Sequence, residues 1–164
     1  MSTSIIEGSL LDSDAKYIVH QTNCISYGAS GLAEFIFRKF PYADIYKERK
    51  INGNWHLPGN IYISGGGANR FIINAMGQFL PGKPASNTVA GLLIKETAEV
   101  RVKYFSKCLS SIACINDLSS IDFPWRIGCG LAGGDWDQYY KMIDSFATKV
   151  STVRVRIVKR PEDN

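Results

Sequence analysis

The chain has 164 residues, of which 45% are hydrophobic, and its 19 basic and 15 acidic side chains give a net charge of +4. This apolar content excludes an intrinsically disordered chain, and the length predicts a single domain spanning residues 1–164, with a core over about residues 5–158 and a short polar tail. The basic residues bunched at 154–160 are typical of a solvated strand face, so we expect no nucleic-acid partner.

Strand-like and helical patterns alternate along the chain. We expect strands at residues 4–7, 17–21, 60–64, 70–76, 120–123 and 153–159. Apolar residues at helical spacing predict one helix that starts near Ser30, one over residues 98–112 and one that starts at Asp135. The segments 50–59 and 79–87 are expected to be surface loops. This alternation predicts a layered α/β fold.

Three glycine-rich segments follow predicted strands, at residues 28–31, 65–67 and 128–134. Ligands of open α/β sheets bind beyond the carboxyl ends of the strands, so we expect these segments to converge on one cleft. Residues 123–136, FPWRIGCGLAGGDW, are the most informative, because a strand there leads into four glycines and then a helix. Glycine N–H groups beside a helix N-terminus bind anions, and this segment therefore predicts a phosphate-binding loop.

Three other interpretations of this loop fail on its context. A dinucleotide-binding loop follows the first strand of its fold, whereas this loop lies near the C-terminus, and the Gly-Lys-Ser/Thr of a nucleoside-triphosphate loop is absent. In a cysteine phosphatase an arginine would occupy the position of Asp135, six residues after Cys129. Cys129 is therefore not expected to be a nucleophile.

Polar residues that suit sugar chemistry end the second predicted strand. The Asn23 amide both donates and accepts hydrogen bonds, as ribose hydroxyls require, and His20 suits proton exchange near neutral pH. The alternative for His20 is a half-buried, hydrogen-bonded structural histidine. Asp135, with Gln138 three positions later, is expected to cap the last helix, and a carboxylate held there would also orient an attacking water.

The cysteines indicate a reducing compartment, because they form no C-x-x-C pair: Cys24, Cys108, Cys114 and Cys129. The first residues lack the basic and apolar regions of a secretory signal, and no apolar run approaches the ~20 residues of a membrane-spanning helix. We therefore expect a cytoplasmic monomer without membrane association. No spacing typical of a zinc site occurs, so neither a metal nor another cofactor is expected.

In these segments the sequence resembles the macrodomains, which are ADP-ribose-binding α/β/α modules. The resemblance covers the order of elements over residues 5–158 and is specific at EGSL (7–10), at residues 18–33 and at residues 123–136. GASGLA (28–33) together with GCGLAGGDW (128–136) is most similar to the branch that contains the ADP-ribose-1″-phosphate phosphatases. The resemblance implies a three-layer α/β/α sandwich around a central mixed sheet.

The resemblance also implies the site residues. His20 and Asp135 would lie near the anomeric carbon as catalytic residues. Ser9 stands where the family has an adenine-binding aspartate, which leaves adenine to the backbone or to an aromatic such as Trp136. His20 replaces the first asparagine of an Asn-Ala-Ala-Asn run, which disfavours the mono-ADP-ribosyl hydrolases that depend on that run. The implied ligand contacts are Ser9, Leu10, Asn23, Gly28, Ala29, Ser30, Gly31, Ile127, Gly128, Cys129, Gly130, Leu131, Ala132, Gly133 and Trp136.

Three functional hypotheses follow from the resemblance. The first is metal-independent hydrolysis of the terminal phosphate of ADP-ribose-1″-phosphate, with His20 and Asp135 dividing proton transfer and water positioning. The second is removal of ADP-ribose from modified macromolecules in the same cleft. The third is a binding module that captures ADP-ribose without chemistry. In each case the expected partner is a small-molecule ligand, ADP-ribose or its 1″-phosphate.

Overall fold

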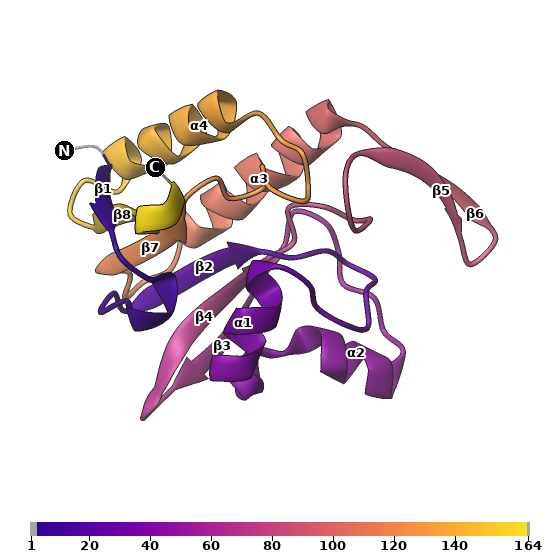
Figure 1. Ribbon diagram of the computed structural model, residues 1–164, viewed down its shortest axis with the longest axis horizontal. Coiled ribbons are helices and arrows are strands. Elements are labelled where there is room, and N and C mark those ends of the chain that lie inside the picture. The colour runs from indigo at the N-terminus through magenta and orange to yellow at the C-terminus, as the bar shows by residue number, and fades with distance from the viewer. Residues whose placement is uncertain (1–2, 164) are drawn as a thin grey trace.

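The computed structural model describes residues 3–163 and contains a six-stranded sheet with helices on both faces (Figure 1). The strand order is β1-β8-β7-β2-β4-β3; β3 is antiparallel to β4 and the other neighbours are parallel. The predicted α/β/α sandwich with a mixed sheet is therefore confirmed. The strands are β1 (Ser4–Glu7), β2 (Tyr17–Gln21), β3 (Ile61–Gly66), β4 (Asn69–Ala75), β7 (Ser120–Pro124) and β8 (Arg154–Lys159).

The two helical layers cover opposite faces of β2. Tyr17 and Val19 pack into one core with residues of α3 and α4, whereas Ile18 packs into the other core with residues of α1 and α2. This follows from the period of two in a strand, because successive side chains point to opposite faces. The helices are α1 (Leu32–Lys39), α2 (Ile45–Asn52), α3 (Ala98–Ala113) and α4 (Trp136–Lys149), with 3-10 turns η1 (Leu10–Asp12), η2 (Pro41–Ala43) and η3 (Pro161–Asp163).

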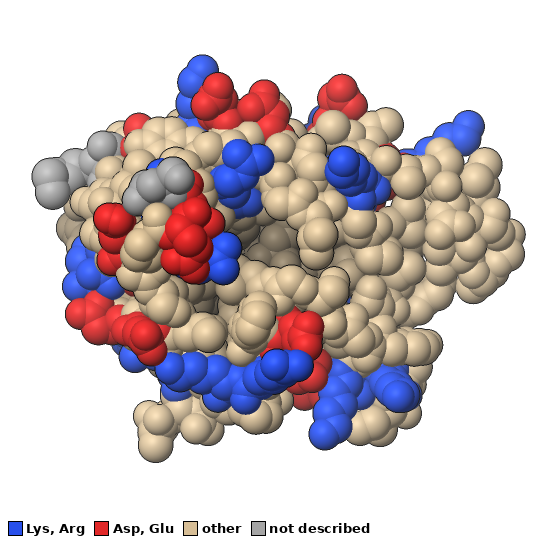
Figure 2. Space-filling view, in the orientation of Figure 1, with Lys and Arg blue, Asp and Glu red and all other residues tan. Residues whose placement is uncertain are grey.

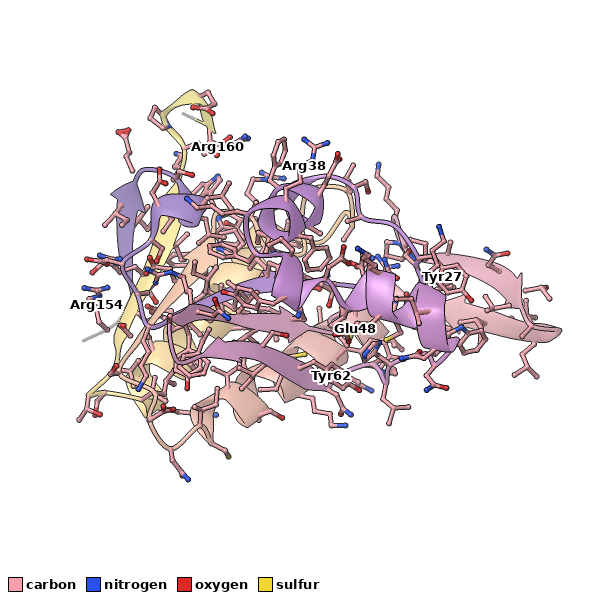
Figure 3. All side chains as sticks on the ribbon, turned by 90° about the horizontal axis from the view of Figure 1, so that it is seen from below. Tyr27, Arg38, Glu48, Tyr62, Arg154 and Arg160 are labelled. Atoms are coloured by element: carbon pink, nitrogen blue, oxygen red, sulfur yellow. The ribbon has the colours of Figure 1, made fainter. Side chains whose placement is uncertain are left out.

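Two elements that the sequence pattern does not predict extend into the segments 50–59 and 79–87, which are expected to be loops. Helix α2 extends through residue 52, and a separate two-stranded sheet, β5 (Ala85–Val89) with β6 (Leu92–Glu96), projects from the body of the molecule (Figure 1). The hairpin lies at the end of the molecule opposite Arg154 and Arg160 (Figure 3). Its turn residues Ala90 and Gly91 have φ of 49° and 82°. Positive φ at both positions suits the right-handed twist of a hairpin.

The carboxyl ends of several parallel strands lie side by side at one end of the sheet. Strand β2 pairs in parallel with both β4 and β7, so the segments that follow these strands start side by side. The contact with the chain after β4 continues beyond the ladder, where the N–H of Thr22 donates to Ala75 O and that of Cys24 to Phe79 O. Strand β3 is antiparallel, so residues 65–67 lie at the opposite end of the strands, where the parallel strands begin. The prediction that this glycine segment joins the cleft is wrong.

Candidate functional site

A cleft of about 660 Å³ lies beyond the carboxyl ends of β1, β2, β4 and β7. Figure 2 shows the corresponding hollow in the face of the molecule, lined mainly by uncharged atoms. Its volume is typical of small-molecule sites, which span about 300–1,000 Å³. The predicted catalytic residue His20 lines it, as do the predicted ligand contacts Ser9, Leu10, Asn23, Gly28, Ser30, Gly31, Ile127, Gly128, Gly130, Leu131 and Ala132.

The two glycine segments meet across this cleft. Gly31 has a φ of 60°, and a Cβ placed on it would lie 3.0 Å from Cδ1 of Leu131. Glycine therefore permits both the left-handed backbone and the close approach of the second loop. The convergence of residues 28–31 with residues 128–134, which the sequence predicts, is confirmed.

The loop after β7 leaves several backbone donors without partners. Within it, Cys129 N donates to Arg126 O, Gly133 N to Gly130 O and Gly134 N to Gly128 O, which closes the loop on itself. Among residues 3–163, no hydrogen bond is made by the N–H groups of Gly128, Gly130, Leu131 and Ala132, nor by those of residues 28–31. Unpartnered N–H groups on two loops around a concave site favour an anionic ligand such as a pyrophosphate.

Asn23 faces the cleft with a fixed side chain. Its Oδ1 accepts hydrogen bonds from the N–H groups of Ile25, at 3.1 Å, and Ser26, at 2.8 Å. These bonds identify the other amide atom as Nδ2, which makes no hydrogen bond within residues 3–163. Asn23 therefore offers the cleft a hydrogen-bond donor, and not the combined donor and acceptor that the sequence suggests.

His20 lines the cleft as a neutral imidazole. It is 1% exposed, and its Nε2 lies 2.6 Å from Oδ1 of Asn74, whose Nδ2 donates to Ala43 O. Because Asn74 Oδ1 can only accept, His20 Nε2 carries the proton and Nδ1 is left as an acceptor. That Nδ1 is buried and has no partner in the described chain.

Burial lowers the pKa of His20 to about 4, although the bond to Asn74 acts in the opposite direction. The folded pKa lies below the unfolded value, so the unfolded chain takes up a proton first. The contribution of His20 to the free energy of unfolding is therefore fully present above about pH 6.5. It decreases by about 3 kcal/mol as the pH falls from there to about 4. The proton exchange near neutrality that the sequence suggests is not expected of this side chain.

We expect His20→Gln to remove this part of the acid sensitivity. Between pH 7 and pH 4 the free energy of unfolding should fall by about 3 kcal/mol more in the wild type than in the variant, in urea titrations at both pH values. The matched control is His56→Gln. Its free energy of unfolding should fall as steeply as that of the wild type, apart from the smaller contribution that His56 makes. Equal losses in wild type and His20→Gln would contradict the assignment.

Several predicted site residues lie outside the cleft lining: Ala29, Cys129, Gly133, Asp135 and Trp136. Asp135 is the predicted N-cap of α4, because its Oδ1 accepts from the N–H of Asp137, and it is exposed. Trp136 packs against Trp125, with ring centroids 5.0 Å apart. Cys129 is buried, and burial raises the pKa of its thiol to about 12.

The cleft also contains residues that the sequence did not identify as functional. Trp125 and Arg126 line it between the strand end and the glycines, and Phe35 of α1 lines it from the other side. Arg126 has a φ of 62° although it is not glycine. The one sequence signal for a functional role of Arg126 is its place just before the glycine-rich loop, and nothing in the sequence marks its left-handed backbone. Within residues 3–163 no cluster of three or more potential metal ligands occurs.

No protein-family model matches the chain, and no curated protein is significantly similar to it. Solved structures are similar. The macrodomain of Thermus aquaticus DarG matches with a TM-score of 0.70 and 21% identity, over 95% of this chain and 97% of that chain. A mutant macrodomain from Oceanobacillus iheyensis, solved with ADPR, matches with a TM-score of 0.63 and 20% identity, over 94% of this chain and 83% of that chain. The chain has the macrodomain fold.

A third macrodomain-fold match comes from a longer protein. Thermosipho africanus DarTG in complex with ADP-ribose matches with a TM-score of 0.70 and 16% identity, over 98% of this chain and 43% of that chain. Macrodomain folds thus recur at low identity with ADP-ribose bound to some of them. Within residues 3–163 of this macrodomain fold, no helix has the length and apolar character needed to cross a bilayer.

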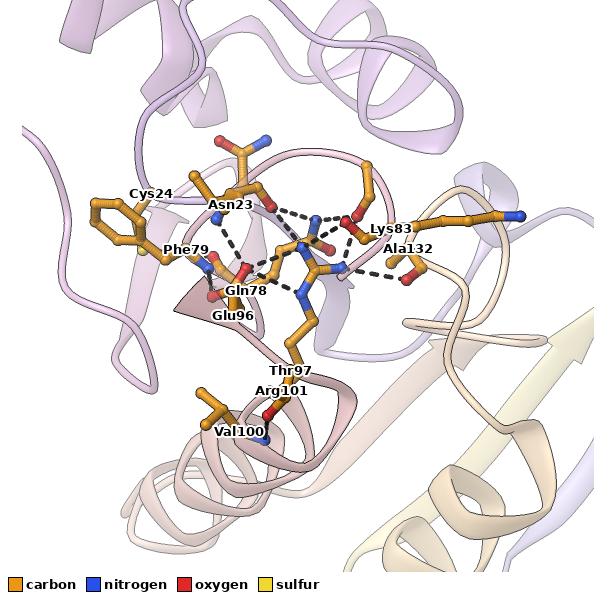
Figure 4. Close-up of polar contacts among 12 residues, drawn as sticks. Asn23, Cys24, Gln78, Phe79, Lys83, Glu96, Thr97, Val100, Arg101 and Ala132 are labelled. Carbon is orange, nitrogen blue, oxygen red and sulfur yellow. Dashed lines mark hydrogen bonds and ion pairs between the residues drawn. The ribbon is translucent and has the colours of Figure 1, made fainter. Parts of the chain in front are cut away.

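A buried ion pair ties the segment after β4 to the glycine loop after β7 (Figure 4). Arg101 Nη2 lies 2.9 Å from Glu96 Oε1, and both side chains are almost fully buried. Glu96 accepts hydrogen bonds from the N–H groups of Phe79 and Leu80. Arg101 donates to the carbonyls of Leu80, Gly82 and Ala132. The pair therefore fixes two walls of the cleft relative to each other.

Proposed function

We propose that the cleft binds ADP-ribose and its derivatives. The observation that carries this proposal is the set of unpartnered N–H groups on two glycine segments that meet at Gly31 and Leu131 around one cleft. A pyrophosphate supplies acceptors for such groups, and the Asn23 donor and His20 acceptor suit the hydroxyls of an adjoining ribose. Structures of the same fold that contain ADP-ribose support this choice of ligand.

We further propose that the protein hydrolyses the terminal phosphate of ADP-ribose-1″-phosphate without a metal ion. Arg126 supports this choice, because it belongs to the cleft lining and its guanidinium forms no ion pair within residues 3–163. An arginine fork suits the oxygens of a phosphate monoester, and free loop N–H groups would stabilise the charge that develops on them.

In this proposal a water oxygen bonds to phosphorus, the bond from phosphorus to the C1″ oxygen breaks, and that oxygen takes up a proton. His20 Nδ1, a buried and unprotonated acceptor, would orient the water or the neighbouring hydroxyl once a side-chain shift on ligand binding opens it to the cleft. Asp135 is engaged as the cap of α4 and lies outside the lining, so we give it no part in the proton transfer. The products are ADP-ribose and inorganic phosphate.

Phosphate release from ADP-ribose-1″-phosphate tests the reaction. We expect Arg126→Ala to lower the rate roughly 10- to 100-fold, because a charge-assisted hydrogen bond to the reacting phosphate is lost. Arg38→Ala is the matched control, since Arg38 is exposed on α1 and does not line the cleft, and its rate should not change.

Other results would assign the cleft differently. ADP-ribose binding without phosphate release, by the wild type, would exclude the phosphatase. If ADP-ribose were then freed from modified protein or nucleic acid, the protein would be an ADP-ribosyl hydrolase. Binding with turnover of neither substrate would identify a binding module.

A further inference from the structure

Arg49 of α2 is a buried cation that has no carboxylate partner among residues 3–163. The buried Asp, Glu, Lys and Arg side chains of the described residues are Arg49, Glu96, Arg101 and Asp122. Glu96 pairs with Arg101, and Asp122 pairs with Arg156, but Arg49 is 0% exposed and forms no ion pair within residues 3–163. A buried charge without a counter-charge is costly, so its presence requires an explanation.

The guanidinium of Arg49 holds the turn that carries Asn23. Nη2 donates to the carbonyl of Asn23 at 3.0 Å, and Nη1 donates to the carbonyl of Ser26 at 2.8 Å. Tyr46, whose ring centroid lies 5.0 Å from the guanidinium carbon, accepts through its hydroxyl from the Asn23 N–H at 2.9 Å. Both ends of the turn are therefore fixed from α2, which Glu48 marks in Figure 3.

The remaining contact of Arg49 is to a neutral group. His56 Nδ1 lies 2.8 Å from Arg49 Nη2, and because arginine only donates, this nitrogen must be an unprotonated acceptor. All acceptors around the guanidinium, two carbonyls and one imidazole, thus satisfy its N–H groups without balancing its charge. The turn it holds lines the cleft at Asn23 and Ser26.

We infer that Arg49 is a positioning residue of the cleft: it fixes the turn that presents Asn23, and it keeps one uncompensated positive charge beneath a site that takes an anionic ligand. The inference rests on the proposed ADP-ribose binding, which it extends to a residue outside the cleft lining. The ligand's phosphates would supply the negative charge that the protein lacks at this place.

A double-mutant cycle measured by calorimetry with ADP-ribose tests the positioning role. Arg49→Lys keeps the charge but loses the two-pronged geometry, so we expect binding to weaken about tenfold. In an Asn23→Ala background the same change should have no further effect, because Arg49 acts through that side chain. A role in general stability alone would give equal losses in both backgrounds and would overturn the inference.

Charge is tested on the same helix. Arg49→Met should bind ADP-ribose more weakly than Arg49→Lys, whereas Lys50→Met, an exposed position that loses the same charge, should bind like the wild type. Equal affinities of Arg49→Met and Arg49→Lys would overturn the electrostatic half of the inference. If Arg49→Met does not fold, Arg49→Gln, which also loses the charge but keeps a hydrogen-bond donor, takes its place in the comparison with Arg49→Lys.

A measurement without ligand separates this inference from the proposed function. In the free protein, Arg49→Lys should speed hydrogen exchange at the Ile25 and Ser26 N–H groups, which bond to the Asn23 side chain. If the wild type fails to bind ADP-ribose while exchange still speeds up, the proposed function fails and the positioning of the turn stands. Unchanged exchange would overturn the positioning itself.

Discussion

Replacing Arg101 with methionine is expected to lower the free energy of unfolding by about 3–5 kcal/mol, because Glu96 is left as a buried charge without a partner. The side chains of Arg101 and Glu96 are 2% and 1% exposed. The change also removes the donors to Leu80, Gly82 and Ala132, so both walls of the cleft lose their connection (Figure 4). Urea denaturation of the free protein measures the loss.

A second variant separates the charge from the packing. Glu96→Gln combined with Arg101→Met removes both charges, and we expect the double variant to be more stable than Arg101→Met alone. Arg101→Lys keeps the charge but loses the several N–H donors of the guanidinium. Its free energy of unfolding should lie between those of the wild type and Arg101→Met. A loss below about 1 kcal/mol for Arg101→Met would mean that solvent reaches Glu96 and that the pair does not hold the cleft.

Gly128→Ala is expected to cost about 2–4 kcal/mol of stability and to weaken ADP-ribose binding, because it combines backbone strain with overpacking. Gly128 has a φ of 74°, and a Cβ there would lie 2.6 Å from Cε2 of Tyr139 and 3.0 Å from Oε1 of Gln21. Tyr139 is buried in the core between the sheet and α3 and α4, so the loop and not the ring would have to move. Unfolding curves and calorimetric titrations measure the two effects.

The matched control for this substitution lies two residues further on. A Cβ on Gly130 would meet nothing within 4 Å, and the backbone there does not have a positive φ. Gly130→Ala should therefore change the free energy of unfolding by less than about 0.5 kcal/mol. Similar stabilities of the two variants would contradict the positive φ of Gly128 and its close approach to Tyr139.

The elements that the sequence predicts correctly are those whose pattern depends on burial in the sheet. The sequence predicts β1 and β2 with the observed bounds, and the apolar spacing that predicts α3 follows its buried face. The sequence pattern does not predict helix α2, because its sequence IYKERKIN has few apolar residues and its buried face includes Arg49. The sequence pattern does not predict the β5–β6 hairpin either, because Ala90 occupies a turn position where Asn or Asp is typical.

The sequence predicts the parts of the candidate site whose backbone shape depends on glycine. It does not predict the parts that depend on tertiary contacts. The positions of residues 28–31 and 128–134 after predicted strands indicate that the two segments converge. The neutral state of His20 depends on its burial, and its tautomer depends on Asn74, which no sequence spacing links to it. Arg49 lies in a charged run that is typical of a solvated helix, and only the turn at residues 23–26 that covers it reveals its burial.

Calorimetric titration of the protein with ADP-ribose and, in parallel, with AMP tests most directly whether the two glycine segments bind a pyrophosphate. We expect saturable one-to-one binding of ADP-ribose and distinctly weaker binding of AMP, which has no pyrophosphate and no second ribose for Asn23 and His20 to contact. Absence of binding heat with ADP-ribose, or equal affinity for AMP, would contradict the assignment of the cleft.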